Sequence, residues 1–173
     1  VGLPQNDYAD RRKTVAAHLA ILDRVSALPG VRSAAASTCL PLAEQLCPGG
    51  PMFVEGRPLP VGSIAPFVRI HAVSGGYFDT MGMRLLRDRG VDQSDVERDE
   101  PIAVVNDALV RISFPDQDPV GQRIRLGNPS LAPGAAEWLT IVGVVSNTPY
   151  AGLSEPTPSA QMFIPMFTSR NVN

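Results

Sequence analysis

The chain has 173 residues, which is long enough for one substantial hydrophobic core or two small ones. Its formal net charge of −2 gives no electrostatic footprint for nucleic acid, so we discount that class of partner. Its 17 prolines and 15 glycines predict many turns and short elements, and they argue against a helical bundle.

The first predicted element is a helix that Asp7 or Asp10 can cap and that runs to about Leu28. Apolar residues recur along it at spacings of three and four and make one stripe: Val15, Leu19, Leu22, Val25 and Leu28. We expect this stripe to be buried, with a gross stabilisation of about 8–15 kcal/mol before conformational entropy is subtracted. A Pro-Gly pair ends the helix, and the small residues at 31–38 predict a strand packed closely beneath it.

Two cysteines, Cys39 and Cys47, lie in the loop that follows. In an oxidising compartment they could pair and close a loop of about nine residues, at a nominal benefit of about 2.5 kcal/mol. The alternative is two unpaired thiols in a flexible loop. Two cysteines without nearby histidines supply too few ligands for a metal site, so none is expected here.

The next segments predict short strands and one short helix. Residues 52–55 and 67–73 are predicted strands, separated by a turn and by a connector rich in proline and glycine. Residues 74–81 predict a short helix, which a glycine breaks, and residues 83–86 predict a brief extended piece.

A cluster of aromatic residues and methionines in and after this helix has two interpretations. Tyr77, Phe78, Met81 and Met83 could form an adaptable apolar surface for a substrate or a partner. Packing in the core is the alternative and the more ordinary role for such side chains.

Charged residues cluster on both sides of residue 90. Residues 92–100 carry five carboxylates but lack the ligand offsets and the glycine of a calcium loop, so we expect a solvated acidic turn. Four arginines could form a basic rim: Arg84, Arg87, Arg89 and Arg98. The expected arrangement is instead a solvated face paired with the acids, and exposed pairs of this kind contribute little to stability.

The middle of the chain predicts a strand, a capped helix, a turn and a second strand. The apolar run at 102–105 suits a strand that is covered on both faces. Asn106 stands at the N-cap position, where its side-chain oxygen can accept a backbone N–H. Phe114 and the proline after it stop the helix, and residues 123–126 resume an alternating strand. Two further strands are predicted at 138–146 and 161–165.

The residues that catalysis would need are few. The chain has two histidines, and we expect structural roles for His18, beside the apolar stripe of the first helix, and for His71, on a strand face. Ser74 is followed by two glycines but lacks the G-x-S-x-G pattern of a nucleophile elbow. No G-x-G-x-x-G or P-loop occurs, so we expect no nucleotide binding within this chain and no cofactor.

No apolar run approaches the roughly 20 residues needed to span a bilayer, and no signal peptide is evident at Val1. Taken alone, these observations indicate a cytosolic protein.

Several sequence motifs resemble those of a known protein family. VVNDAL…FPDQDPVGQRIRLG resembles VVNEALARRFFP-x-x-DPVG-x-R-I, and ALPGVRSAAASTCLPL resembles ALPGV-x-SAA…LPL. VEGRPLP, VSGGYFDTMGMRLLRDR, WLTIVGVVSN and MFIPM resemble further segments of the same family. The matches run in family order over nearly the whole chain, which is therefore similar to the MacB-like periplasmic core domain of FtsX-like ABC transporter permeases.

The resemblance implies an α+β fold of short mixed strands with two or three helices. Residues 1–74 and 151–173 would form a porter-like lobe, and residues 75–150 a smaller inserted α/β lobe. Relatives continue beyond the last predicted strand before they re-enter the membrane, so we expect this lobe to be incomplete and to expose a strand edge, through which the chain could dimerise.

The implied function is non-enzymatic. The domain would lie on the periplasmic side of the cytoplasmic membrane and couple ATP-driven motion of transmembrane helices to export of a substrate or to action on a periplasmic partner. The implied partners are its own transmembrane helices, a second permease copy, a cytoplasmic ATPase domain or subunit, and a periplasmic adaptor protein. Two other classes stay open: a free-standing module that binds a small ligand, and a serine hydrolase that uses Ser74 or His71.

Overall fold

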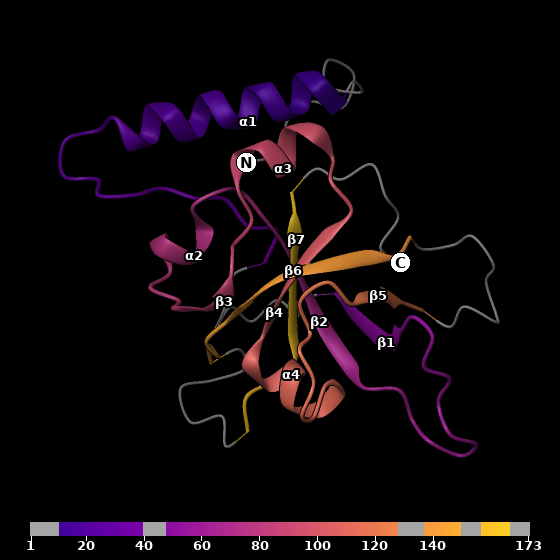
Figure 1. Cartoon of the computed structure of the whole chain (residues 1–173). Coiled ribbons are helices and arrows are strands. Elements are labelled where there is room, and N and C mark those ends of the chain that lie inside the picture. The colour runs from indigo at the N-terminus through magenta and orange to yellow at the C-terminus, as the bar shows by residue number, and fades with distance from the viewer. Residues whose placement is uncertain (1–10, 40–47, 128–136, 150–156, 167–173) are drawn as a thin grey trace.

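A computed structural model describes residues 11–39, 48–127, 137–149 and 157–166 (Figure 1). The described part contains four helices and seven strands, so the predicted α+β class is confirmed, with more helices than the two or three expected. The helices are α1 (Arg11–Ser26), α2 (Tyr77–Thr80), α3 (Gln93–Arg98) and α4 (Asp107–Ser113). The strands are β1 (Gly49–Val54), β2 (Phe67–Val73), β3 (Leu85–Asp88), β4 (Ile102–Asn106), β5 (Arg123–Leu126), β6 (Leu139–Val145) and β7 (Gln161–Pro165).

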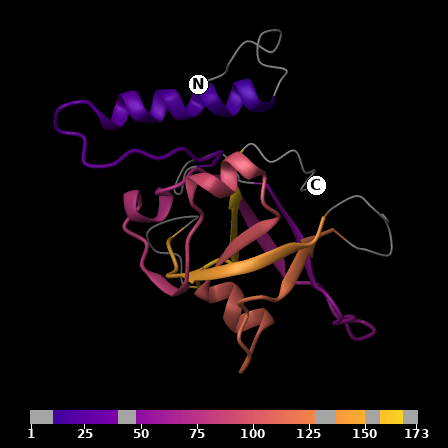
Figure 2. The same ribbon diagram turned by 45° about the horizontal axis from the view of Figure 1, so that its top comes forward.

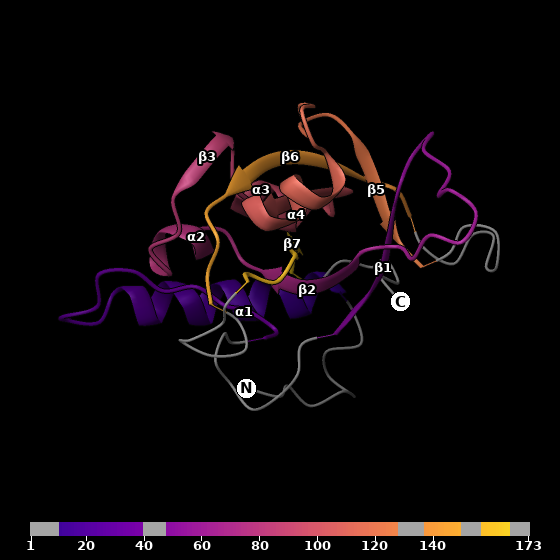
Figure 3. The ribbon, with the colours of Figure 1, turned by 90° about the horizontal axis from the view of Figure 1, so that it is seen from below.

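Six of the strands form a closed ring, which Figure 3 shows from below. The order runs β6-β4-β7-β2-β1-β5, and β5 pairs back onto β6. One edge of β6 is taken along its length by β4, whereas β5 and β3 share the other edge. Of the described strands, β3 alone pairs on a single edge. The ring therefore leaves few backbone groups without a partner strand.

The inside of the ring is a continuous apolar core to which every ring strand contributes. On β4 the inward side chains are Ala103 and Val105, whereas Ile102 and Val104 face outward and are covered by the helices α1, α2 and α3. Both sets are buried, which explains why this strand is apolar at successive positions, as the sequence predicts. Leu109 of α4 packs into the inner core from one end of the ring. Figure 2 shows α1 on the opposite side of the molecule from α4.

Asn106 caps α4, which confirms the sequence prediction. Its Oδ1 accepts the backbone N–H of Leu109 at 3.1 Å. The same oxygen accepts the N–H of Gln161 at 2.9 Å, and its Nδ2 donates to the carbonyl oxygen of Ser159 at 2.9 Å. This fully buried side chain therefore joins α4 and β4 to the start of β7.

Replacing Asn106 with alanine should lower the free energy of unfolding by about 2–3 kcal/mol, because a helix cap is lost and buried backbone groups lose their partners. Urea titration monitored by circular dichroism measures this change. Asn147→Ala is a control for a half-buried asparagine: its Oδ1 accepts one backbone N–H, from Ala108 at 2.8 Å. Equal losses in the two variants would contradict the role of Asn106 as a junction.

Two predictions near the N-terminus are wrong. Residues 31–38 form no strand; the only pairing there is a single bridge between Ser37 and Val73. The apolar stripe of α1 is not buried along its length either, since Val15 is 5% exposed whereas Leu28, just past the helix, is 55% exposed. Periodicity predicted an amphipathic helix, but the ring covers only its first half, so the predicted stabilisation is too large.

The strands of the two predicted lobes all belong to one sheet. β1, β2 and β7 lie in 1–74 and 151–173, whereas β3 to β6 lie in 75–150, and the two groups pair at β4–β7 and at β1–β5. The division into a porter-like and an inserted lobe stays a prediction, as does dimerisation through a strand edge. β3 is the described strand that offers such an edge.

Candidate functional site

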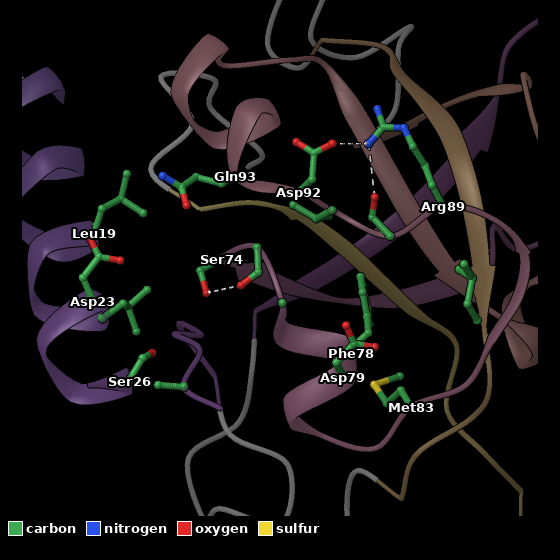
Figure 4. Close-up of a pocket in the computed structure, with 17 residues that line it drawn as sticks. Leu19, Asp23, Ser26, Ser74, Phe78, Asp79, Met83, Arg89, Asp92 and Gln93 are labelled. Atoms are coloured by element: carbon green, nitrogen blue, oxygen red, sulfur yellow. Dashed lines mark hydrogen bonds and ion pairs between the residues drawn. The ribbon is translucent and has the colours of Figure 1, made fainter. Parts of the chain in front are cut away.

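A cleft of about 540 Å³ lies between α1 and the body of the protein (Figure 4). One wall belongs to α1. The other walls come from the 74–76 turn, α2, the beginning of β3 and the 89–93 segment that leads into α3. These stretches are separated in sequence, so the cleft exists only in the folded chain.

Apolar side chains line the cleft on both sides, among polar and charged ones. Leu19 and Leu22 line it from α1, and Phe78 and Met83 line it from the other side. Phe78 and Met83 are also part of the core that covers the outside of the ring, where Phe78 packs edge to face on Phe163 with ring centroids 5.2 Å apart. This wall is therefore fixed by the core, whereas α1 packs on the body mainly near Val15.

Arg89 and Asp95 form a bidentate ion pair beside the cleft. Arg89 Nη1 lies 2.6 Å from Asp95 Oδ2, and Nη2 lies 3.0 Å from Oδ1. Asp95 is fully buried, and its Oδ2 also accepts the backbone N–H of Asp92 at 2.9 Å. The hydrogen bond to Asp95 raises the pKa of Arg89 above its ordinary value. The guanidinium is thus held in place at one end of the cleft.

Asp92 is the N-cap residue of α3. Its Oδ1 accepts the backbone N–H of Asp95 at 3.0 Å and the hydroxyl of Ser94 at 2.6 Å. The Ser94 hydroxyl is the main reason why the pKa of Asp92 lies below its ordinary value. Asp92 and Asp95 therefore make a capping box in which each side chain accepts the other residue's N–H.

The solvated acidic turn predicted for residues 92–100 is therefore wrong. Residues 93–98 form α3, and one of the five carboxylates is buried in an ion pair. Two of the four arginines pair with these acids as expected, Arg89 with Asp95 and Arg98 with Glu100 at 3.1 Å. The missed signal was the three-residue spacing of Asp92 and Asp95, which is the spacing of a capping box.

Ser74 lines the cleft, but its hydroxyl is already used by the fold. Its Oγ accepts the backbone N–H of Ala36 at 2.9 Å and donates to the carbonyl oxygen of Gly75 at 3.2 Å. Gly75 is required beside it, because a Cβ at this position would lie 2.8 Å from the backbone nitrogen of Gln93. These contacts pin the 36–38 segment and the start of α3 to the end of β2, and they give no support to the serine hydrolase alternative.

The two histidines occupy structural positions. His18 Nδ1 lies 2.8 Å from the carbonyl oxygen of Thr14, one turn earlier in α1. His71 is fully buried on β2 and stacks on Phe163 with ring centroids 4.9 Å apart. Burial lowers the pKa of His71 to about 4, partly offset by a hydrogen bond with the backbone of Cys39.

The lowered pKa of His71 makes stability depend on pH. Between pH 6.5 and 4 the unfolded chain takes up a proton that the folded chain does not, so the folded state loses stability as the pH falls through this range. The loss from this residue should total about 3 kcal/mol. Urea titrations at a series of pH values measure it, and His71→Phe should flatten the profile in this window. An unchanged profile in that variant would assign the pH dependence to other groups.

The structure buries three of the four residues that were predicted to form either a partner surface or part of the core. Tyr77, Phe78 and Met83 are buried, as the core-packing alternative expects, and Met81 lies at the surface. Burial raises the pKa of the Tyr77 hydroxyl, partly offset by a hydrogen bond with Ser37. Phe78 and Met83 also line the cleft, and a role in binding stays a prediction.

Cys39 is buried and disulfide-bonded. Cys47, its predicted partner and the only other cysteine in the sequence, lies outside the described residues, so the pairing stays a prediction. Mass spectrometry of a non-reduced digest would identify the linked peptides directly.

The described residues contain no group of three or more histidine, cysteine, aspartate or glutamate side chains arranged to hold a metal ion. Within the same part of the chain, no helix has both the length and the apolar character needed to cross a membrane.

Comparison with known proteins identifies a family. The model of the MacB-like periplasmic core domain matches residues 6–173. No curated protein matches the chain.

Solved structures share the fold at low sequence identity. One is the periplasmic region of MacB from Actinobacillus actinomycetemcomitans, with a TM-score of 0.58 and 15% identity. Another is the extracellular domain of the ABC-type transporter YknZ from Gram-positive bacteria, with a TM-score of 0.55 and 12% identity. The matches cover 87% and 83% of this chain but 55% and 59% of those chains, so this chain spans little more than half of their length.

Proposed function

Because this chain belongs to the family of MacB-like periplasmic core domains, we propose that it acts as the extracytoplasmic domain of an ABC transporter permease. In this proposal the domain carries out no chemistry. It converts ATP-driven movement of transmembrane helices into work on an exported substrate or on a periplasmic partner. The observation that carries the proposal is the family match, which extends over residues 6–173.

The proposed partners follow from this role. They are the transmembrane helices of the same permease, a second permease copy, a cytoplasmic ATPase domain or subunit that hydrolyses ATP, and an adaptor protein on the periplasmic side. The periplasmic side of the cytoplasmic membrane is also an oxidising compartment, where a disulfide at Cys39 would persist.

The closed ring supports a mechanical role. A part that transmits displacement must be stiff, and every ring strand is hydrogen-bonded on both edges to a neighbouring strand. The ring is filled by one apolar core, and the outer side of β4 is covered as well. Close-packed interiors of this kind resist deformation and transmit strain.

Flexible insertions in the complete permease test the coupling. About ten Gly/Ser residues, placed where the domain joins each transmembrane helix, would behave as a flexible coil and would absorb displacement. We expect ATP hydrolysis to continue while export falls to the level of a variant that cannot hydrolyse ATP. Export is measured as substrate transport into inverted vesicles or proteoliposomes.

An insertion of the same length that forms a helix, rich in Ala, Glu and Lys, is the matched control and should preserve more of the export activity. The thermal unfolding of the domain should be the same in both variants. Full export with the flexible insertions would contradict mechanical coupling.

A further inference from the structure

The cleft beneath α1 is lined by apolar side chains and by three aspartates. We propose that it binds a small organic cation with an apolar body. The apolar part would contact Leu19, Leu22, Phe78 and Met83, which line the cleft from its two sides. The positive charge would lie among the carboxylates contributed by α1, α2 and the N-cap of α3.

The charges that line the cleft favour a cation. Asp23 of α1, Asp79 of α2 and Asp92 all line it, and Arg89 is the one basic residue among the described side chains of the lining. The guanidinium of Arg89 is already engaged, by both oxygens of Asp95 and by Asp92 Oδ2 at 3.5 Å.

Asp23 and Asp79 have no ion pair among the described residues, and both are exposed. The cleft therefore presents two uncompensated negative charges next to an apolar surface. An organic anion would meet repulsion at both.

The size of the cleft indicates the kind of cation. A volume of about 540 Å³ lies in the range of pockets that hold drug-sized ligands. The carboxylates are not arranged in a group that could hold a metal ion, within the part of the chain that the structure describes. The apolar side chains in the lining favour a ligand with an apolar surface, because contact between the two would remove both from water. A bulky organic cation satisfies each of these conditions.

A ligand in this position would also fasten α1 to the body. Leu19, Leu22 and Asp23 belong to α1, whereas Phe78, Met83 and Asp79 belong to the opposite wall. Binding would therefore bridge the two and raise the midpoint of thermal unfolding, since a ligand of the folded state stabilises it.

Two probes of the same shape and opposite charge test the proposal on this chain. Tetraphenylphosphonium is a cation with an apolar body, and tetraphenylborate is its anionic counterpart. Isothermal titration calorimetry should detect one site for the cation, with affinity that falls as salt is added. Asp23→Asn and Asp79→Asn should each weaken binding by about three- to tenfold. Asp116→Asn removes the same charge from the turn after α4, outside the cleft, and should leave the affinity unchanged.

Several results would overturn the proposal. Equal binding of the borate probe, or phosphonium binding that neither cleft variant weakens, would show adsorption to apolar surface without a cation site. No binding of the phosphonium probe would also overturn it. Binding of an oligolysine peptide but not of the phosphonium would assign the acidic cleft to a basic polypeptide partner instead. Because these measurements need only this chain, their outcome is independent of the insertion experiment on the permease.

Discussion

Replacing Asp95 with alanine should lower the free energy of unfolding by about 2–3 kcal/mol, because a fully buried carboxylate that accepts three hydrogen bonds would be lost. The side chain is fully buried and accepts three hydrogen bonds, two from Arg89 and one from the backbone of Asp92. Its removal would leave the Arg89 guanidinium partly desolvated without its main counter-charge. It would also break half of the capping box that begins α3. Urea titration at neutral pH measures the loss.

Glu97→Ala is the matched control, since it removes an exposed carboxylate from the same helix. In α3 this carboxylate accepts one hydrogen bond, from the side chain of Gln93 at 2.9 Å. We expect it to change the free energy of unfolding by about 0.5 kcal/mol or less. A double variant, Arg89→Leu with Asp95→Leu, should be more stable than the sum of the single variants predicts, because neither charge is then left alone. A small loss of stability in Asp95→Ala would mean that water solvates the Arg89 guanidinium in place of Asp95. The ion pair would then contribute little to the stability of the segments around the cleft.

Replacing Gly143 with alanine should destabilise the protein by about 3 kcal/mol or more, because the new methyl group has no space. A Cβ at this position on β6 would lie 1.9 Å from the carbonyl oxygen of Arg89, which is backbone and cannot rotate away. The chain after β3 would have to move off β6. The amide of Arg89, which donates to the carbonyl oxygen of Val142 at 3.2 Å, should then exchange its hydrogen faster.

Gly50→Ala is the control for this substitution. Gly50 lies in β1, and a Cβ there would meet no atom within 4 Å. We expect an effect within about 1 kcal/mol, since alanine costs less backbone entropy than glycine on folding. Equal stabilities of the two variants, measured by thermal unfolding and hydrogen exchange, would contradict the close approach of β3 and β6.

The sequence predicted elements whose pattern is local. The strands at 67–73, 123–126 and 161–165 have the bounds that alternation and turn residues indicated. Asn106 caps α4 as predicted, because a cap depends on residues three positions apart. The family was also evident from motifs in order along the chain, and the family model confirms it.

The candidate site was predicted only in part, since Phe78 and Met83 were named from the sequence but the cleft that they line was not. The sequence did not predict that Asp23 and Asp79 line a cleft. The sequence pattern of a helix is the same whether an exposed aspartate faces open solvent or another element. Asp95 was assigned to a solvated turn because composition reports how many charges a segment has and not what covers them. The partner that decides its role, Arg89, comes from the segment after β3.

What the sequence determined by itself is therefore the set of elements and the family, both of which depend on patterns within short segments. What only the tertiary structure decided is which face of each element is covered. The return of β5 onto β6 closes the ring, the ring supports α1 along half of its length, and the remainder of α1 overhangs a cleft. Periodicity shows that a helix has an apolar face, but burial of that face depends on contacts between residues far apart in the chain.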